Sequence, residues 1–164
     1  LSSESLNKVS LMSSDWLLFD TFTFCSQGGY QVAKEALNIA KENNISICYG
    51  LSDITLLEPN KASISWLIEQ DIHYIVGNNE EFLLFNKLFN FPRSRQLITK
   101  GENGATLDHI NIKAKNISTK STNGAGDALT GTFIALVLRE GKQRALERAV
   151  EYASSVCLFE EPRL

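Results

Sequence analysis

The sequence has few of the residues that mark several common classes of protein. Its three cysteines, Cys25, Cys48 and Cys157, are widely spaced and form no CxxC pair. Neither a disulfide framework nor a zinc site is therefore expected, and we expect reduced, mostly buried thiols. The two histidines, His73 and His109, lie far apart. We expect each to be a packed or surface residue rather than a catalytic one.

Long apolar runs and blocks of like charge are also missing. No apolar run approaches the roughly 18 to 20 residues of a membrane span, and residues 1–14 lack the basic start and apolar centre of a secretory signal. Lys and Arg number 16 against 19 Asp and Glu, which gives a formal charge of −3 without a basic block. Nucleic acid and anionic membranes are therefore disfavoured as partners, and we expect a cytoplasmic protein.

The composition is that of one globular domain. The chain has 164 residues, of which 43% are hydrophobic, and this is enough to fill a core of that size. Short apolar runs alternate with helical patterns, which predicts a parallel sheet covered by helices, with ligands at the carboxyl ends of the strands. The expected strands are 16–19, 45–49 and 74–76, followed by short strands or a hairpin at 95–99, 105–107 and 110–113; the expected helices are 31–42, 59–69, 80–88, 128–139 and 144–158.

The most informative segment is Thr122-Asn123-Gly124-Ala125-Gly126-Asp127-Ala128, which places two glycines and a carboxylate at the start of a predicted helix. A helix start has unsatisfied backbone N–H groups and the positive end of the helix dipole, so an anionic oxygen can bind there. Asp127 would repel that anion, so we expect it to hold a hydroxyl group that attacks phosphorus. The segment is neither a Walker loop nor a dinucleotide fingerprint, because the required Gly-Lys-Ser/Thr and third glycine are missing. A tight turn with an Asp in the first helical turn is the alternative.

Two further strand ends carry polar or glycine-rich segments. Asn78 and Glu81 follow the third predicted strand and can share one face of the next helix, where they could order water around Mg²⁺. A capping box at the start of that helix is the alternative. Thr99, Gly101 and Gly104 follow the next strand, where a nucleotide could lie against the backbone; hairpin geometry is the alternative.

Asn-x-x-Glu, Thr-x-Gly-x-x-Gly and Gly-Ala-Gly-Asp, in this order and each after a predicted strand, resemble the carboxyl-terminal half of the PfkB, or ribokinase-like, family of carbohydrate and nucleoside kinases. The resemblance runs from Trp16 to the last helix and is most specific over residues 121–127. It implies an α/β fold, a three-layer sandwich with a mostly parallel sheet flanked by helices, whose amino-terminal part is missing. It also implies that residues 1–164 form a single partial kinase domain.

The resemblance implies a role for each matched residue. Asp127 would accept the proton of the substrate hydroxyl, and Gly124, Ala125 and Gly126 would form the anion hole for the transferred phosphoryl group. The cofactors would be ATP and Mg²⁺, with a monovalent cation as a further candidate. The residues that would bind the nucleotide are Thr99, Gly101, Gly104, Asn123 and Ser154. Those that would bind the metal are Asn78 and Glu81. The partner would be a small sugar or nucleoside.

The sequence departs from the family pattern at Ser121, where an acidic residue is usual, and at Asn123, where a second Thr is common. The amino-terminal half of the family carries the sugar-binding residues and the lid. Two hypotheses follow: a kinase half that works with a complementing amino-terminal half, or a non-catalytic, nucleotide-binding remnant. The edge of the sheet would be unpaired without that half, which favours formation of a homo-oligomer.

Overall fold

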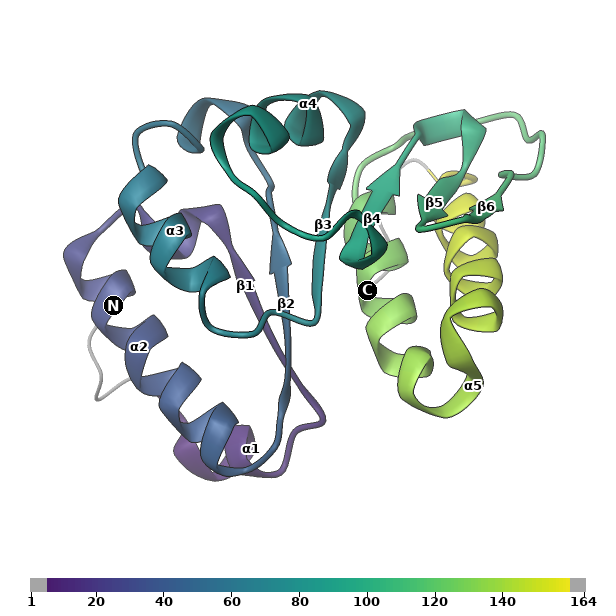
Figure 1. The fold of residues 1–164 in the computed structure, drawn as a ribbon. Coiled ribbons are helices and arrows are strands. Elements are labelled where there is room, and N and C mark those ends of the chain that lie inside the picture. The colour runs from purple at the N-terminus through teal and green to yellow at the C-terminus, as the bar shows by residue number, and fades with distance from the viewer. Residues whose placement is uncertain (1–5, 160–164) are drawn as a thin grey trace. The chain divides into compact units, whose positions relative to one another are not determined.

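The computed structural model describes residues 6–159 and divides the chain into two compact units, which meet between Arg95 and Gln96 (Figure 1). Each unit buries its own apolar side chains. Phe19, Leu37, Ile47 and Phe85 are in the core of the first unit, and Phe133 is in that of the second. In the described residues, no helix is both long enough and apolar enough to cross a lipid bilayer.

The first unit contains a parallel three-stranded sheet of β1 (Trp16–Asp20), β2 (Ser46–Gly50) and β3 (Tyr74–Asn78). In the observed register Leu18 lies beside Cys48, and Cys48 lies beside Tyr74. β2 is the central strand and is buried from Ser46 to Tyr49. The prediction of three parallel strands in this region is confirmed.

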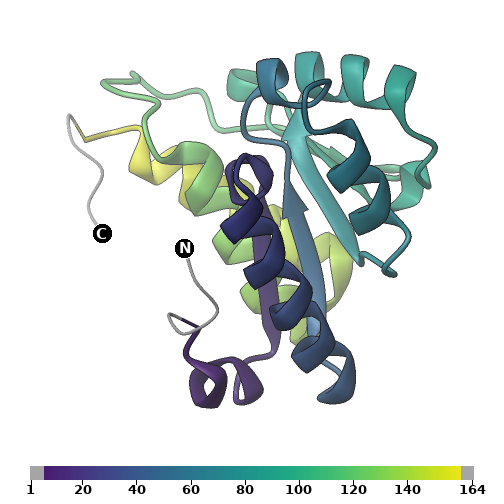
Figure 2. The same cartoon turned by 90° about the vertical axis from the view of Figure 1, so that its left-hand side faces the viewer.

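Helices connect these strands, as the sequence pattern predicts, and α2 and α3 lie on the same face of the sheet (Figure 2). α2 buries a stripe of small and apolar residues. It begins earlier than its predicted start at residue 31, because Ser26 caps its first turn: the hydroxyl oxygen of Ser26 accepts the Gly29 N–H at 3.1 Å. A short helix that precedes β1 was not predicted. The helices are α1 (Lys8–Met12), α2 (Gln27–Glu42), α3 (Lys61–Ile68) and α4 (Asn79–Leu88).

The second unit contains an antiparallel sheet of β4 (Gln96–Thr99), β5 (Ala105–Leu107) and β6 (Ile110–Ile112), which packs against α5 (Ala125–Val156). The hairpins predicted for this region are confirmed. α5 consists of two helical segments that meet at Gly141, whose φ of 79° and ψ of 166° interrupt the helix. The prediction of two final helices is therefore confirmed, with the break at a glycine.

All three cysteines are free thiols, as predicted. Cys48 is fully buried, and burial raises the pKa of its thiol to about 12, so it stays protonated at neutral pH. Cys157 is half-buried. The prediction of buried thiols is wrong for Cys25, which is exposed near the end of a 3₁₀ turn at Thr21–Phe24.

Candidate functional site

The start of α5 has the form expected for an anion-binding helix start. The Ala125 N–H donates to the Thr122 carbonyl at 3.2 Å, which closes a turn, and Gly124 adopts a left-handed φ of 76° as the N-cap residue. The next two backbone N–H groups, those of Gly126 and Asp127, have no hydrogen-bond acceptor among the described residues. They are left for water or a ligand at the positive end of the helix.

Both of these residues are accessible. Gly126 and Asp127 are exposed, and a Cβ atom built on Gly126 would lie within 4 Å of no other atom outside its own helix turn. The structure thus leaves open space beside the two unpaired N–H groups. The Asp127 carboxylate belongs to the same helical turn, where it can accept a hydrogen bond from a hydroxyl group.

Residues 120 and 121, which lead into this turn, are held by hydrogen bonds to Cys157 near the end of the second unit. The Cys157 carbonyl accepts the Lys120 N–H at 2.9 Å and the Ser121 N–H at 3.4 Å. The Asn123 N–H donates to the Ser121 hydroxyl oxygen at 3.2 Å. Ser121 and Asn123, where the sequence departs from the family pattern, therefore contact each other, and Ser121 helps to shape the approach to Gly124.

The segment from Thr99 to Gly104 forms the turn between β4 and β5. The Lys100 N–H donates to the Gly104 carbonyl at 2.8 Å, and the Gly104 N–H donates to the Gly101 carbonyl at 3.0 Å. Gly104 has a φ of 86°, and a Cβ there would lie 2.0 Å from the Ile112 carbonyl oxygen. Gly101 has a φ of 55° with open space around it. The hairpin interpretation is confirmed, and a nucleotide contact at this turn stays a prediction.

Asn78 and Glu81 form a capping box at the start of α4. The Asn78 N–H donates to Oε2 of Glu81 at 2.8 Å, and the Glu81 N–H donates to Oδ1 of Asn78 at 2.9 Å. Glu81 is buried, and burial raises the pKa of its carboxyl group; the Asn78 N–H partly opposes this shift, and the negative charge of Asp53 adds to it. The helix-capping interpretation is thus confirmed for this pair.

The capping box leaves room for an indirect role in holding a metal ion. Oε1 of Glu81 accepts no hydrogen bond from any described residue, so it can bind a metal-bound water. No group of three His, Cys, Asp or Glu side chains in residues 6–159 is placed to hold a metal ion directly. The pair therefore fits Mg²⁺, which keeps several of its waters, better than an ion that needs a full set of protein ligands.

Sequence reasoning missed Gly77, which lies against Glu81. A Cβ at Gly77 would lie 2.8 Å from Oε2 of Glu81 and 2.7 Å from Cδ1 of Leu51, so only glycine fits there. Ser52 has a φ of 56° in the turn after β2, where the Asp53 N–H donates to the Leu51 carbonyl at 2.6 Å. The glycine four residues before Glu81 was a readable signal, whereas nothing in the sequence marks the left-handed conformation of Ser52.

Ser154 lies in the second segment of α5 and is buried. Its hydroxyl group donates to the Val150 carbonyl of the same helix at 2.8 Å. An adenine contact by Ser154 stays a prediction.

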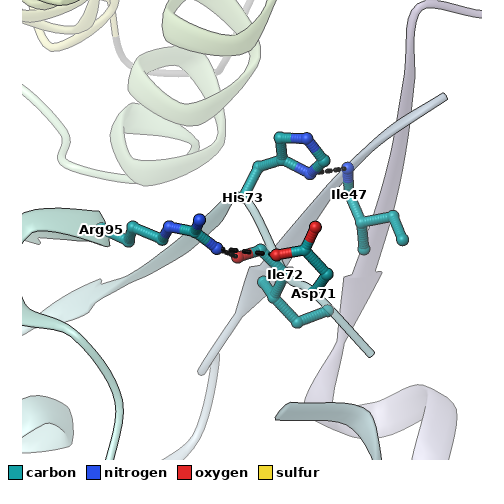
Figure 3. A network of polar contacts seen from close by, with 5 residues as sticks. All are labelled: Ile47, Asp71, Ile72, His73 and Arg95. Atoms are coloured by element: carbon teal, nitrogen blue, oxygen red, sulfur yellow. Dashed lines mark hydrogen bonds and ion pairs between the residues drawn. The ribbon is translucent and has the colours of Figure 1, made fainter. Parts of the chain in front are cut away.

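His73 takes part in a polar network at the beginning of β3 (Figure 3). Nδ1 of its ring accepts the Ile47 N–H at 3.1 Å, and Arg95 donates to Asp71 at 3.0 Å and to the Ile72 carbonyl at 2.9 Å. The Trp16 ring meets the His73 ring edge to face, with 5.9 Å between the ring centres. His73 is thus an exposed residue whose hydrogen bond to Ile47 joins β2 to the start of β3.

Comparison with solved structures identifies the architecture. Adenosine kinase from Sinorhizobium meliloti superposes on 100% of the chain with a TM-score of 0.88 at 18% sequence identity, and the match covers 55% of that protein. The chain has a ribokinase-like fold. Adenosine kinase from Schistosoma mansoni, solved with 2-fluoroadenosine, matches 100% of the chain with a TM-score of 0.80 at 20% identity. A candidate ribokinase II from E. coli, solved with ATP and Mg²⁺, matches 99% with a TM-score of 0.81 at 15% identity.

The chain spans about half the length of these ribokinase-like proteins, since the matches cover 57% of the S. mansoni kinase and 58% of the E. coli protein. No family model matches the sequence, and a search of curated proteins finds no match. The predicted fold class is confirmed.

Proposed function

We propose that this chain provides the nucleotide-binding and catalytic part of an ATP-dependent kinase that phosphorylates a hydroxyl group of a sugar or nucleoside. One observation carries the proposal: an exposed helix start leaves the N–H groups of Gly126 and Asp127 unpaired beside an exposed carboxylate. Kinases that phosphorylate small molecules need these two elements together, one for the phosphoryl group and one for the attacking hydroxyl.

The proposal assigns separate tasks to the residues at this helix start. The N–H groups of Gly124, Gly126 and Asp127 donate to the oxygens of the migrating phosphoryl group, and the helix dipole offsets part of their negative charge. The Asp127 carboxylate accepts a hydrogen bond from the acceptor hydroxyl, orients it for in-line attack and takes its proton as the bond to phosphorus forms. The acceptor gains the phosphoryl group, and ADP leaves.

The remaining predicted residues have supporting tasks. Thr99, Gly101 and Gly104 would present backbone to the nucleotide, Asn123 would lie on its phosphate side, and Ser154 would face its adenine. Asn78 and Glu81 would hold Mg²⁺ through water. When bound, the metal supplies positive charge to the phosphate oxygens.

Gly126→Ala tests the proposal directly. The new methyl group meets no other atom, so the fold should persist, but an anion can no longer approach the helix start closely. Gly131→Ala is the matched control, because it also adds a methyl group in open space on the same helix. We expect Gly126→Ala to weaken binding of ATP with Mg²⁺ by about tenfold, roughly the loss of one good hydrogen bond, and Gly131→Ala to leave it unchanged.

Calorimetric titration with ATP and Mg²⁺ measures both variants, and circular dichroism verifies their fold. Asp127→Asn separates binding from chemistry, because it should keep nucleotide affinity but abolish phosphoryl transfer in an enzyme that turns over. Equal affinity of the two glycine variants, or the lack of any ATP binding by the wild-type chain, would overturn the proposal.

A further inference from the structure

The sequence contains two Asn-Gly dipeptides, Asn123-Gly124 before α5 and Asn103-Gly104 in the turn between β4 and β5. In such a dipeptide the backbone nitrogen of the glycine can attack the carboxamide of the asparagine and close a succinimide ring, because glycine has no Cβ that hinders the approach. The reaction needs a backbone N–H that is free to lose its proton and a carboxamide that is free to turn. The structure distinguishes the two dipeptides by the first of these requirements.

Asn123 meets both requirements. In residues 6–159 the Gly124 N–H has no hydrogen-bond acceptor, and the Asn123 carboxamide makes no hydrogen bond. The Asn123 side chain is exposed, and only its backbone N–H is held, by the Ser121 hydroxyl oxygen at 3.2 Å. Gly124 also lies at the positive end of the helix dipole, which stabilises negative charge on a deprotonated nitrogen.

Asn103 is also exposed, but the nitrogen that follows it is engaged. The Gly104 N–H donates to the Gly101 carbonyl at 3.0 Å, so this hydrogen bond must break before a ring can close. Gly104 is buried, and a Cβ there would lie 2.0 Å from the Ile112 carbonyl oxygen. This turn therefore leaves little room for the backbone to move towards the carboxamide.

We propose that Asn123 is a site of spontaneous deamidation in the folded chain. The Gly124 nitrogen forms a bond to Cγ of Asn123, the bond from Cγ to Nδ2 breaks, and ammonia leaves with the proton that the Gly124 nitrogen gives up. Water then opens the succinimide at one of its two carbonyl carbons, which yields aspartate or isoaspartate. The reaction consumes only water, and no group is oxidised or reduced.

Either product carries a carboxylate directly before Gly124, where Asn123 has a neutral side chain. That charge repels an anion at the N–H groups of Gly126 and Asp127, a consequence that rests on the proposed function. Isoaspartate also lengthens the backbone within the turn that the Ala125 N–H closes on the Thr122 carbonyl. Deamidation would thus lower the affinity for a nucleotide irreversibly as the protein ages.

Peptide mapping by mass spectrometry tests the proposal on the folded chain held in mildly alkaline buffer. The mass difference between a carboxamide and a carboxylic acid reports the conversion at each residue. We expect Asn123 to convert at least about tenfold faster than Asn103, roughly the effect of one good hydrogen bond at the slower site. In denaturant, where the hydrogen bond of Gly104 is lost, the two residues should convert at similar rates.

Asn123→Gln is the matched variant, because it keeps the carboxamide but places it one carbon further from the Gly124 nitrogen. It should abolish conversion at this position and leave that of Asn103 unchanged, and circular dichroism verifies its fold. Equal rates at Asn123 and Asn103 in the folded chain, or faster conversion of Asn103, would overturn the proposal.

A separate titration with ATP and Mg²⁺ tests the consequence for binding. We expect Asn123→Asp, which carries the charge of the deamidated chain, to bind at least about tenfold more weakly than the wild type. Equal affinities would show that the new charge does not act on the nucleotide. A wild-type chain that binds no ATP would overturn the proposed function, whereas the peptide map alone decides whether Asn123 deamidates.

Discussion

At the scale of single residues, His73 links stability to pH. Its Nδ1 accepts the Ile47 N–H only while that nitrogen is unprotonated, and although the residue is exposed, partial burial of the ring lowers its pKa. The pKa of the folded state thus lies below the unfolded value of about 6.5, so the unfolded chain binds the proton more readily. This contribution to stability is present above about pH 6.5 and is lost as the pH falls through the folded pKa.

His73→Asn removes the titration but keeps an oxygen that can accept the Ile47 N–H. As the pH is lowered from about 7 to about 5, we expect the unfolding free energy of the wild type to decrease relative to that of His73→Asn. Urea denaturation at several pH values measures it, with His109→Asn at an exposed position as the control. A difference between wild type and His73→Asn that stays constant over this range would contradict the assignment.

Two glycines of one turn should differ in their tolerance of a side chain. Gly104→Ala forces a Cβ to within 2.0 Å of the Ile112 carbonyl oxygen at a φ of 86°, and we expect it to lower the unfolding free energy by about 3 kcal/mol. Gly101→Ala meets only the left-handed φ of 55° and should cost about 1 kcal/mol. Denaturant titration of both variants provides the comparison, and equal losses would show that the close contact is not rigid.

At the scale of helices and strands, Gly141 separates the two segments of α5. Its φ of 79° with a ψ of 166° is a conformation that only glycine adopts easily. Because a Cβ there meets no other atom, strain of the backbone alone should decide the effect of Gly141→Ala, which we expect to lower the unfolding free energy by about 1–3 kcal/mol. Thermal unfolding followed by circular dichroism measures the loss. An unchanged melting temperature would mean that the break moves to a neighbouring residue without cost.

The sequence predicts the elements better than their ends. The strands at Trp16, Ser46 and Tyr74 follow from apolar runs, and the break between the final helices follows from the loss of periodicity around Gly141. The start of α2 could not be placed, because Ser26 is a weak signal until its hydroxyl is seen on the Gly29 N–H. The periodic pattern starts later than the helix does.

At the candidate site too, the sequence predicts some features and leaves others to be seen only in the structure. The glycines and Asp127 were predicted at a helix start, and the structure places them there. The pairing of Asn78 with Glu81 was predicted as one of two alternatives, since spacing shows that two side chains can meet but not which atoms they bond. The requirement for Gly77 and the left-handed Ser52 depend on contacts between distant segments, which a single sequence does not reveal.

At the scale of the whole molecule, the proposed tasks are divided between two compact units. The first holds Asn78 and Glu81, and the second holds the β4–β5 turn and the start of α5. Each set rests on the packing of its own unit, so a variant that loosens one core should impair the residues of that unit first.

The two hydrogen bonds to the Cys157 carbonyl have a consequence for insertions and deletions. They join the loop before Gly124 to the end of the second segment of α5, so the two bonds depend on the rotational phase of the helical turns between Gly141 and Cys157. One added residue in the segment after Gly141 would turn that carbonyl by about 100° around the helix axis, away from Lys120 and Ser121. These two hydrogen bonds thereby constrain the number of residues in the segment after Gly141 more strictly than the identity of its exposed side chains.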